Sequence, residues 1–353
     1  MLAVVLLAAG QGTRMNSRKP KILHDVGGRP MVLHAFLAAA AVADRPPVLV
    51  VGPGENDVAA LIGDRAEYVI QPEALGTGHA TRMAADVLRG HAGQVIVTYA
   101  DMPLLRAETL RRLAEAQRAS GAAVALLSVA GDASSTFGRV VRDGTGRVDA
   151  QGRVIEIVEV AEARRRPNAA ELLAIAELNA GVYCFDGEWL WANIERLPVR
   201  EARRGREYYL TDLIEVAGAQ GRGVVAVAAD DPDEGLGAGT RAEMVAVERA
   251  FRRRVNDHWL ACGVTLVEPE ATYIGPDVTI GLDTVIWPNT FLQGQTTIGE
   301  GCTIGPNAIV RDSQVGRGCR VEQVLLDGQQ LPDDTTVHVG RVAYPPSLNV
   351  DAI

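Results

Sequence analysis

Hydrophobic positions change their spacing along the chain, and the change divides the sequence into two parts. From residue 1 to about 230, short aliphatic runs alternate with Ala-rich or amphipathic stretches, which is typical of βαβ units on a mostly parallel sheet. The aliphatic runs predict strands at residues 4–7, 48–51, 68–70, 95–99 and 124–129. The stretches between them predict helices at residues 31–43, 56–62, 79–88 and 107–120.

Two later segments depart from this alternation. Residues 139–162 are rich in β-branched side chains, with turns at Asp143-Gly144 and Gln151-Gly152, and predict a β-rich excursion. Residues 240–262 read as one continuous helix that is polar on one side, which we interpret as an arm between domains.

The C-terminal part follows a period of six. Four of its aliphatic residues are followed directly by glycine, and the seven that keep the six-residue step are Ile274, Ile280, Ile286, Leu292, Ile298, Ile304 and Val310. A helix repeats its buried face every 3.6 residues, so this period excludes an amphipathic helix. It is instead the hexapeptide pattern of a left-handed parallel β-helix, in which each aliphatic residue fills the interior of a triangular coil.

After Val310 the phase slips by one residue to Val315 and Val321 and then fades. We therefore expect a short coil of three or four turns, from which Pro345-Pro346 leads out. The fold class is an α/β, Rossmann-like domain followed by this β-helix. Its expected parts are residues 1–229 for the α/β domain, 230–262 for the linker and arm, 263–340 for the β-helix and 341–353 for a tail.

Composition agrees with two globular domains and excludes several classes of protein. The 353 residues are 47% hydrophobic and 22% charged, with a net charge of −9, which disfavours disorder and binding to nucleic acid or anionic membranes. The apolar run at residues 1–9 has no basic residue before it and is read as a buried strand, and no stretch reaches the ~20 apolar residues of a membrane span.

The four cysteines give no sign of a disulfide framework or a zinc site. No C-x-x-C pair or histidine at ligand spacing accompanies them, so a reduced, cytoplasmic setting fits best. Those cysteines are Cys184, Cys262, Cys302 and Cys319.

The strongest chemical signal is a glycine-rich turn that follows the first strand. Residues 7–15 read Leu-Ala-Ala-Gly-Gln-Gly-Thr-Arg-Met, and Pro20-Lys21 comes soon after. Such a turn lets backbone N–H groups wrap a phosphate. The alternative is a tight strand-to-helix connection, but the added Arg14 and Lys21 favour phosphate binding.

A second signal is Asp101, in Tyr99-Ala100-Asp101-Met102-Pro103 after the strand at 95–99. Open α/β sheets bind ligands at the carboxyl ends of their strands, and a carboxylate there suits Mg²⁺ shared with phosphates. The alternative is that Asp101 caps the following helix.

These motifs resemble the sugar-1-phosphate nucleotidylyltransferases, and among them the N-acetylglucosamine-1-phosphate uridylyltransferases, over nearly the whole chain. The resemblance implies that Arg14 and Lys21 meet the phosphates and that Asp101 binds Mg²⁺, and these three are the expected catalytic residues. In Gln71-Pro-Glu-Ala-Leu-Gly-Thr-Gly-His-Ala it implies a glutamine that reads uracil. The implied nucleotide-binding residues are Leu7, Ala8, Ala9, Gly10, Gly12, Thr13, Gln71, Gly76 and Thr77.

The resemblance also implies a sugar pocket and a reaction. Its residues would be Tyr99, Gly138, Glu159, Asn179, Tyr209 and Thr211. An oxygen of N-acetylglucosamine 1-phosphate would attack the α-phosphorus of UTP in line, giving UDP-N-acetylglucosamine and pyrophosphate, with no protein nucleophile. Mg²⁺ is the implied cofactor. The implied assembly is a homotrimer through the flat sides of the β-helix.

Two positions depart from the family pattern. Ala100 stands where the family writes glycine, which adds a methyl group near the expected sugar site. Gly239 stands where the family has an asparagine that is its second ligand to Mg²⁺; we expect water or a neighbour such as Asp230 or Asp231 to replace it.

The acetyltransferase activity of the bifunctional members uses later coils of a longer β-helix, so none is expected here, and His338 is interpreted as a strand or tail residue. Two other functions stay open at this point. One is uridylyl or thymidylyl transfer to glucose 1-phosphate or another sugar 1-phosphate, and the other is a non-catalytic subunit that binds sugar nucleotides.

Lysine is rare in this chain. Only Lys19 and Lys21 occur among 35 basic residues. Lys21 falls on the family's phosphate-binding position and Lys19 does not, so Lys19 serves as an internal control for Lys21.

Overall fold

The computed structural model describes residues 1–339 apart from 11, 55, 144–152 and 203–204. Its contacts divide the chain into two units, the first made of Met1–His24 with Pro30–Val247 and the second of Asp25–Arg29 with Glu248–Ile353. The predicted turn at Gln151-Gly152 and the C-terminal tail lie outside the described residues.

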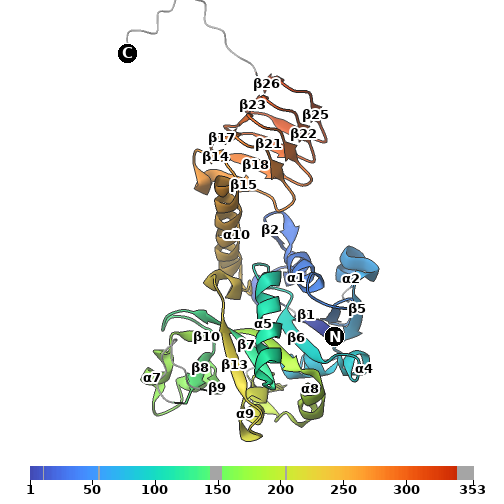
Figure 1. Cartoon of the computed structure of the whole chain (residues 1–353), viewed down its shortest axis with the longest axis vertical. Helices are drawn as coiled ribbons and strands as arrows, with labels where there is room; N and C mark the ends of the chain where they lie inside the picture. The colour runs from blue at the N-terminus through green and yellow to red at the C-terminus, as the bar shows by residue number, and fades with distance from the viewer. Residues whose placement is uncertain (11, 55, 144–152, 203–204, 340–353) are drawn as a thin grey trace, which may run out of the picture. The chain divides into compact units, whose positions relative to one another are not determined.

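The first unit is built on a twisted, mostly parallel sheet (Figure 1). All five strands predicted for it form, and each lies within two residues of its predicted bounds. Along the sheet the order is β13-β7-β10-β6-β1-β4-β5. The bounds are Leu2–Leu7 for β1, Val48–Val51 for β4, Glu67–Ile70 for β5, Gln94–Tyr99 for β6, Val124–Ala130 for β7, Glu177–Asp186 for β10 and Val224–Ala228 for β13.

Strand β10 interrupts the parallel arrangement. It runs antiparallel to both β6 and β7, between which it lies. The excursion predicted at 139–162 contains the antiparallel strands β8 (Arg139–Arg142) and β9 (Val154–Val158), and β8 pairs with β10. Short two-stranded pairs complete the strands before α10: β2 (Asp25–Val26) with β3 (Arg29–Pro30), and β11 (Arg200–Ala202) with β12 (Gly205–Glu207).

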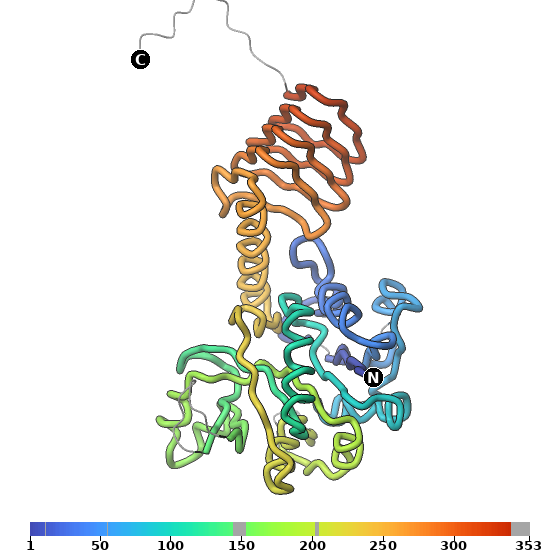
Figure 2. Tube along the Cα trace, viewed as in Figure 1, coloured from blue at the N-terminus to red at the C-terminus, as the bar shows by residue number. Residues whose placement is uncertain are grey.

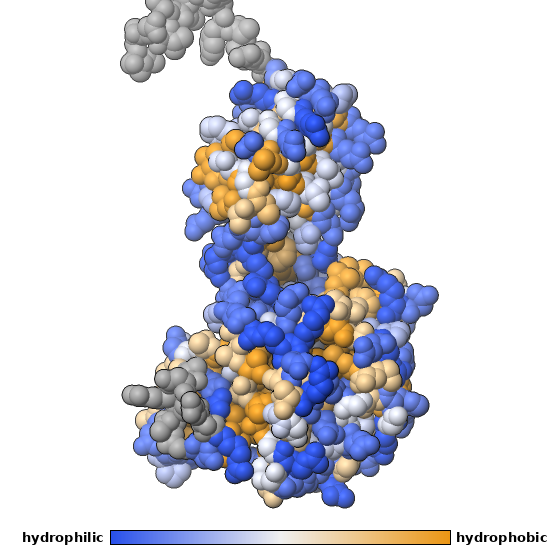
Figure 3. All heavy atoms as spheres, viewed as in Figure 1, coloured by the Kyte–Doolittle hydropathy of each residue, from blue (hydrophilic) through white to orange (hydrophobic). Residues whose placement is uncertain are grey.

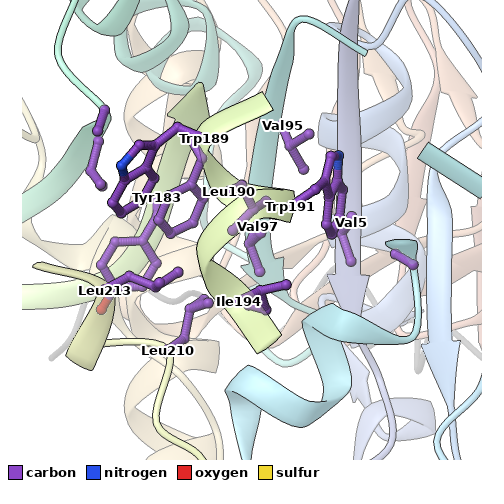
Figure 4. Packing of buried hydrophobic residues seen from close by; sticks show 14 of the residues in the cluster. Val5, Val95, Val97, Tyr183, Trp189, Leu190, Trp191, Ile194, Leu210 and Leu213 are labelled. Atoms are coloured by element: carbon purple, nitrogen blue, oxygen red, sulfur yellow. The ribbon is translucent and has the colours of Figure 1, made fainter. Parts of the chain in front are cut away.

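Helices cover both faces of the sheet. Neighbouring residues of β1 point to opposite cores, because Val5 belongs to one buried cluster and Val4 and Leu6 to the other, as the alternation of side chains along a strand requires. Figure 4 shows Trp189 and Trp191 of α8 in the first of these clusters, together with Val5, Val95 and Val97 of the central strands.

The predicted helices form with one exception. The single helix expected at 79–88 is two short helices, α3 and α4, separated by Met83 and Ala84. The bounds are Met31–Ala40 for α1, Asn56–Ile62 for α2, Thr77–Arg82 for α3, Ala85–Leu88 for α4, Ala107–Ser120 for α5, Val160–Ala163 for α6, Ala169–Leu173 for α7, Gly187–Asn193 for α8, Asp212–Ala219 for α9 and Arg241–Ala261 for α10.

The second unit contains the β-helix, whose coils are stacked in orange and red in Figure 2. Parallel strands form three sheets, with orders β14-β17-β20-β23-β26, β15-β18-β21-β24 and β16-β19-β22-β25. The seven aliphatic residues in six-residue steps are all buried inside the coil. The bounds are Thr265–Leu266, Thr272–Ile274, Thr279–Ile280, Val285–Ile286, Thr290–Gln293, Thr297–Ile298, Thr303–Ile304, Ile309–Arg311, Gln314–Val315, Arg320–Glu322, Leu325–Asp327, Gln330–Leu331 and Thr336–His338 for β14 to β26.

The phase slip after Val310 does not end the coil. Turns shorten instead, because Thr279 pairs with Thr297, 18 residues on, whereas Thr297 pairs with Gln314, 17 residues on. Val315 and Val321 remain in the buried cluster. The described coil has four turns and one further strand, and His338 lies in that last strand, β26, as predicted.

Glycine follows the buried aliphatic residue where the next coil passes close by. A Cβ on Gly281 would lie 2.5 Å from the backbone nitrogen of Glu300, and one on Gly299 would lie 2.7 Å from that of Arg317. Contacts this short exclude a side chain. The recurring Ile-Gly pair therefore has a packing reason.

Candidate active site

The carboxyl ends of β1, β5 and β6 meet at one cavity of about 590 Å³. Ten residues predicted from the sequence line it, so the glycine-rich turn, the glutamine segment and the aspartate strand come together in space. Those ten are Leu7, Ala8, Ala9, Gly10, Lys21, Gln71, Gly76, Thr77, Tyr99 and Asp101. The other lining residues are Ile22, Ala74, Ala80 and Glu207.

Two of the lining residues, Lys21 and Asp101, form an ion pair. The Lys21 ammonium contacts Asp101 Oδ2, and the two side chains are 16% and 19% exposed. Lys21 begins the short 3-10 helix η2 (Lys21–Leu23), whose Ile22 and Leu23 are buried and anchor it. A cation and a carboxylate are thus held together where the strands end.

Gly12 makes room for the lysine stem. Its φ of +59° is in the left-handed region, and a Cβ there would lie 2.5 Å from Lys21 Cβ. Gly12 precedes the 3-10 helix η1 (Thr13–Met15), in which Met15 is buried while Thr13 and Arg14 are exposed. The predicted loop residues Gly12, Thr13 and Arg14 are not in the cavity lining.

Arg14 instead lies beside Gly239. A Cβ on that glycine would lie 2.5 Å from Arg14 Nη2 and 3.0 Å from Glu243 Oε2, and the Gly239 N–H donates to the same Glu243 oxygen at 2.7 Å. Glu243 is therefore the carboxylate that the structure brings to the position of the family's asparagine.

The two aspartates expected near Gly239 have partners elsewhere in the unit. Asp230 contacts Arg112, and Asp231 accepts from Arg106 at 3.0 Å. Nearness in sequence suggested these two aspartates, but Glu243, which is nearer still and lies in the first turn of α10, is the carboxylate that contacts Gly239.

The extra methyl group of Ala100 does not enter the cavity. Ala100 is fully buried, and it packs in the cluster on the α1 and α5 side of the sheet. The expected effect of this methyl on the choice of sugar is therefore not supported by its position.

Glycines at 76 and 181 bring two further segments close to the cavity. Gly76 has φ +91°, and a Cβ on it would lie 2.6 Å from the Tyr208 carbonyl oxygen. Gly181 has φ +79°, and a Cβ on it would lie 2.7 Å from the ring of Tyr99. Neither position has room for a side chain, so both close approaches depend on glycine.

Three of the predicted sugar residues, Gly138, Glu159 and Asn179, lie together. Asn179 is buried at an irregularity in the pairing of β10 with β7, and its amide donates to the Tyr183 hydroxyl and accepts from the Gly181 N–H. Gly138 packs against Glu159, whose carboxyl would lie 3.2 Å from a Cβ there. A bulge of this kind re-aims side chains, and bulges are frequent beside active sites.

Tyr209 and Thr211 come from the segment that packs on α3. The Leu210 N–H donates to Thr77 Oγ1 at 3.1 Å, and the Gly78 N–H donates to the Tyr208 carbonyl at 2.8 Å. Burial raises the pKa of Tyr209, and the neighbouring Glu207 adds to the effect. This segment therefore adjoins the Gly76-Thr77 side of the cavity.

Glu159 should make the protein's stability depend on pH. Burial raises the pKa of its carboxyl, with a further contribution from Glu162 and a smaller opposing one from Arg139. A raised folded-state pKa means that stability falls as pH rises through the unfolded value of ~4.3, until the folded pKa is passed.

We expect Glu159→Gln to melt at a higher temperature than the wild type at pH 7 and at nearly the same temperature at pH 4, measured by calorimetry. If the two proteins differed in melting temperature by the same amount at pH 7 and pH 4, ionisation of Glu159 would not lower the stability of the folded protein. Glu171→Gln, on exposed helix α7, is the matched control.

The site also meets the donor requirements of a magnesium ion. No group of three or more His, Cys, Asp or Glu side chains that could hold a metal occurs among the described residues. Mg²⁺ commonly takes only one or two carboxylates and completes its octahedron with water and substrate phosphates. A single carboxylate at Asp101 beside the glycine-rich turn therefore fits this ion.

Comparison with known proteins agrees with both units. Residues 4–204 match the family model described as a MobA-like NTP transferase domain, and residues 277–312 match the bacterial transferase hexapeptide, six repeats. A putative glucose-1-phosphate thymidylyltransferase of Bacillus anthracis shares the fold, with a TM-score of 0.55 at 20% identity over 70% of this chain and 94% of that one. The fold and the site thus define an NTP transferase domain joined to a hexapeptide β-helix.

Curated relatives identify the family more closely. The bifunctional protein GlmU of Exiguobacterium sibiricum is 41% identical over 93% of this chain and 70% of its own length. That of Trichlorobacter lovleyi is 41% identical over 97% of this chain and 72% of its own length. The chain belongs to the GlmU family, and its function is the uridylyl transfer from UTP to N-acetylglucosamine 1-phosphate that the resemblance implied. No described helix has the length and apolarity to cross a bilayer.

Proposed function

We propose that the cavity at the ends of β1, β5 and β6 is where this enzyme forms UDP-N-acetylglucosamine. The observation that supports this most directly is the contact of Lys21 with Asp101 in the lining of that cavity. Gln71 would read the base, and the glycine-rich turn with Lys21 would hold the phosphates. Arg14, which lies outside the lining beside Gly239, would meet phosphate that extends beyond the lining. The three predicted sugar residues that lie together would hold the sugar.

In this proposal the chain's own residues bind and orient two anionic reactants. Lys21 neutralises phosphate charge, and the backbone around Gly10 approaches the nucleotide because small residues line that part of the cavity. The sugar phosphate then attacks the α-phosphorus in line, so positioning supplies most of the rate. Asp101 would hold Mg²⁺, which supplies further neutralisation of phosphate charge when bound.

The experiment that tests this function measures pyrophosphate release from UTP with a panel of sugar 1-phosphates. We expect N-acetylglucosamine 1-phosphate to be the preferred substrate and EDTA to abolish turnover, with restoration by Mg²⁺. A preference for glucose 1-phosphate would assign the alternative sugar. Turnover that persists in EDTA would remove the metal from the proposal.

The β-helix offers one face for self-association. On the sheet β15-β18-β21-β24 the outward residues in register are Tyr273, Phe291, Ile309 and Leu325. The first two rings stack at 4.3 Å, and Leu325 is 57% exposed. Figure 3 shows apolar side chains gathered on the β-helix in the region where β15 and β18 lie in Figure 1.

The corresponding outward positions on the sheet β16-β19-β22-β25 are polar, and they are Thr279, Thr297, Gln314 and Gln330. An exposed apolar ladder is costly in water, and trimers of such coils associate through flat sides. The apolar face is therefore the one that we assign to a homotrimer.

Leu325→Glu should convert a trimer of 37.5-kDa chains into monomers, as measured by light scattering after size exclusion. A buried, unpaired carboxylate at a contact is strongly unfavourable. Thr297→Glu on the polar face is the control and should remain trimeric. A monomeric wild type would contradict the assembly, and a trimeric Leu325→Glu would contradict the chosen face.

All four cysteines are free thiols. We continue to expect a reducing, cytoplasmic compartment for this enzyme.

A further inference from the structure

A buried pair of side chains, Gln71 and His79, lies at the base-reading part of the cavity. Gln71 directly follows β5 and is 5% exposed, and His79 in α3 is 6% exposed. Gln71 Nε2 lies 3.0 Å from His79 Nδ1 and 3.1 Å from the Gly76 carbonyl oxygen. The function does not explain why a histidine is buried against the base-reading glutamine.

These two contacts determine which end of the Gln71 amide faces which neighbour. A carbonyl oxygen only accepts hydrogen bonds, so the amide atom beside Gly76 must be the NH₂ group. Its second hydrogen then points to His79 Nδ1, which must accept and therefore carries no proton. Both N–H bonds of Gln71 are used in this way.

The group of Gln71 that remains is its carbonyl oxygen, Oε1. Among the described residues, none donates a hydrogen bond to Oε1. Gln71 lines the cavity. Gln71 therefore presents an acceptor and no donor to whatever enters.

The surroundings of His79 keep its ring neutral. Burial lowers the pKa of His79, and the charge of Arg82 lowers it further. The backbone and the charge of Glu73 oppose this lowering of the pKa in part. A neutral imidazole carries one proton, so an Nδ1 that accepts from Gln71 leaves the proton on Nε2.

We propose that His79 is a positioning residue for nucleotide specificity: it holds the Gln71 amide with Oε1 toward the base, so that the site selects a base with a donor at N3. Uracil carries N3–H, whereas N3 of cytosine is an acceptor. This inference rests on the proposed role of Gln71 as the base-reading residue. If His79 did not hold it, the amide would be able to rotate and offer its NH₂ group instead.

The test compares kcat/KM for UTP and for CTP in three proteins. In His79→Leu the acceptor is lost, and we expect the UTP-to-CTP ratio to fall by roughly tenfold or more, the scale of one misplaced hydrogen bond in a buried site. In His79→Asn the amide oxygen replaces Nδ1 as acceptor, so the ratio should stay within about threefold of the wild type. The KM for N-acetylglucosamine 1-phosphate should not change in either.

A Gln71→Ala variant distinguishes failure of the proposed role of Gln71 from failure of the proposed role of His79. If Gln71→Ala leaves the UTP-to-CTP ratio unchanged, Gln71 does not read the base and its proposed role fails. If Gln71→Ala lowers the ratio but folded His79→Leu keeps it, only the role of His79 fails. Circular dichroism checks the folding of each variant.

A measurement on the wild type covers the case in which His79→Leu does not fold. Nitrogen-15 spectra of the imidazole rings report which ring nitrogen carries the proton. The signals of His79 are identified as those that disappear from the spectrum of His79→Asn. We expect an unprotonated Nδ1 and a protonated Nε2 at pH 7.5. A protonated Nδ1 would overturn the proposal.

Discussion

Replacing Asp101 by alanine is expected to reduce the rate of UDP-N-acetylglucosamine formation by about 100-fold or more, on the scale of losing one preorganised transition-state contact. Asp101 is the carboxylate that follows β6 in the cavity, and its side chain is 19% exposed. Its removal takes away the proposed Mg²⁺ ligand and leaves Lys21 without this partner. The measurement is kcat from pyrophosphate release at saturating UTP and sugar phosphate.

Two further variants test whether the loss of activity depends on the position and the charge of Asp101. Asp230→Ala removes an exposed carboxylate that contacts Arg112 and should leave kcat unchanged. Asp101→Asn keeps the size of the side chain and removes its charge, so we expect it to need more Mg²⁺ for half-maximal activity than the wild type. Wild-type kcat in Asp101→Ala would refute the assignment of this cavity as the active site.

Replacing Lys21 by arginine is expected to lower kcat/KM by roughly tenfold to a hundredfold although the charge is kept. The lysine stem passes next to Gly12, where even a Cβ would be 2.5 Å away, and its compact ammonium contacts Asp101. A planar guanidinium is wider and directs its donors in a fixed fork. It cannot take the same place between the turn and the carboxylate.

Lys19 provides a matched control two residues away. It is exposed, and Lys19→Arg should keep kcat/KM within about twofold, since exposed substitutions away from a site have little effect. Equal activity of both arginine variants would show that position 21 needs only a positive charge. Thermal unfolding of the two variants separates lost activity from lost stability.

The spacing of apolar residues predicted the bounds of strands and helices well where those apolar residues form the buried face. The strand at 48–51 and the helices at 56–62 and 107–120 have the predicted bounds, because their apolar spacing follows the face that is buried. The expected helix at 79–88 is two helices in the structure. The spacing of apolar residues continues across the break, so the pattern did not indicate it.

Much of the site was predictable because its residues follow strand ends in sequence. Lys21, Gln71 and Asp101 lie in three motifs, and parallel strands bring their carboxyl ends to one edge. Glu243 was missed although it is close to Gly239 in sequence, because no pattern shows that the first turn of α10 directs its carboxylate back to the Gly239 N–H. His79 lies inside the glutamine motif, but only its ring geometry reveals a role.

The sequence by itself determined the two-part architecture, the six-residue coil and the family motifs, because each depends on spacing along one chain. Only the tertiary structure decided how individual side chains are directed. It placed the methyl of Ala100 in the core and Glu243 beside Gly239, and it oriented the amide of Gln71. The spacing of apolar residues does not show where one side chain points, even toward a residue a few positions away, so these contacts become visible only when the chain is folded.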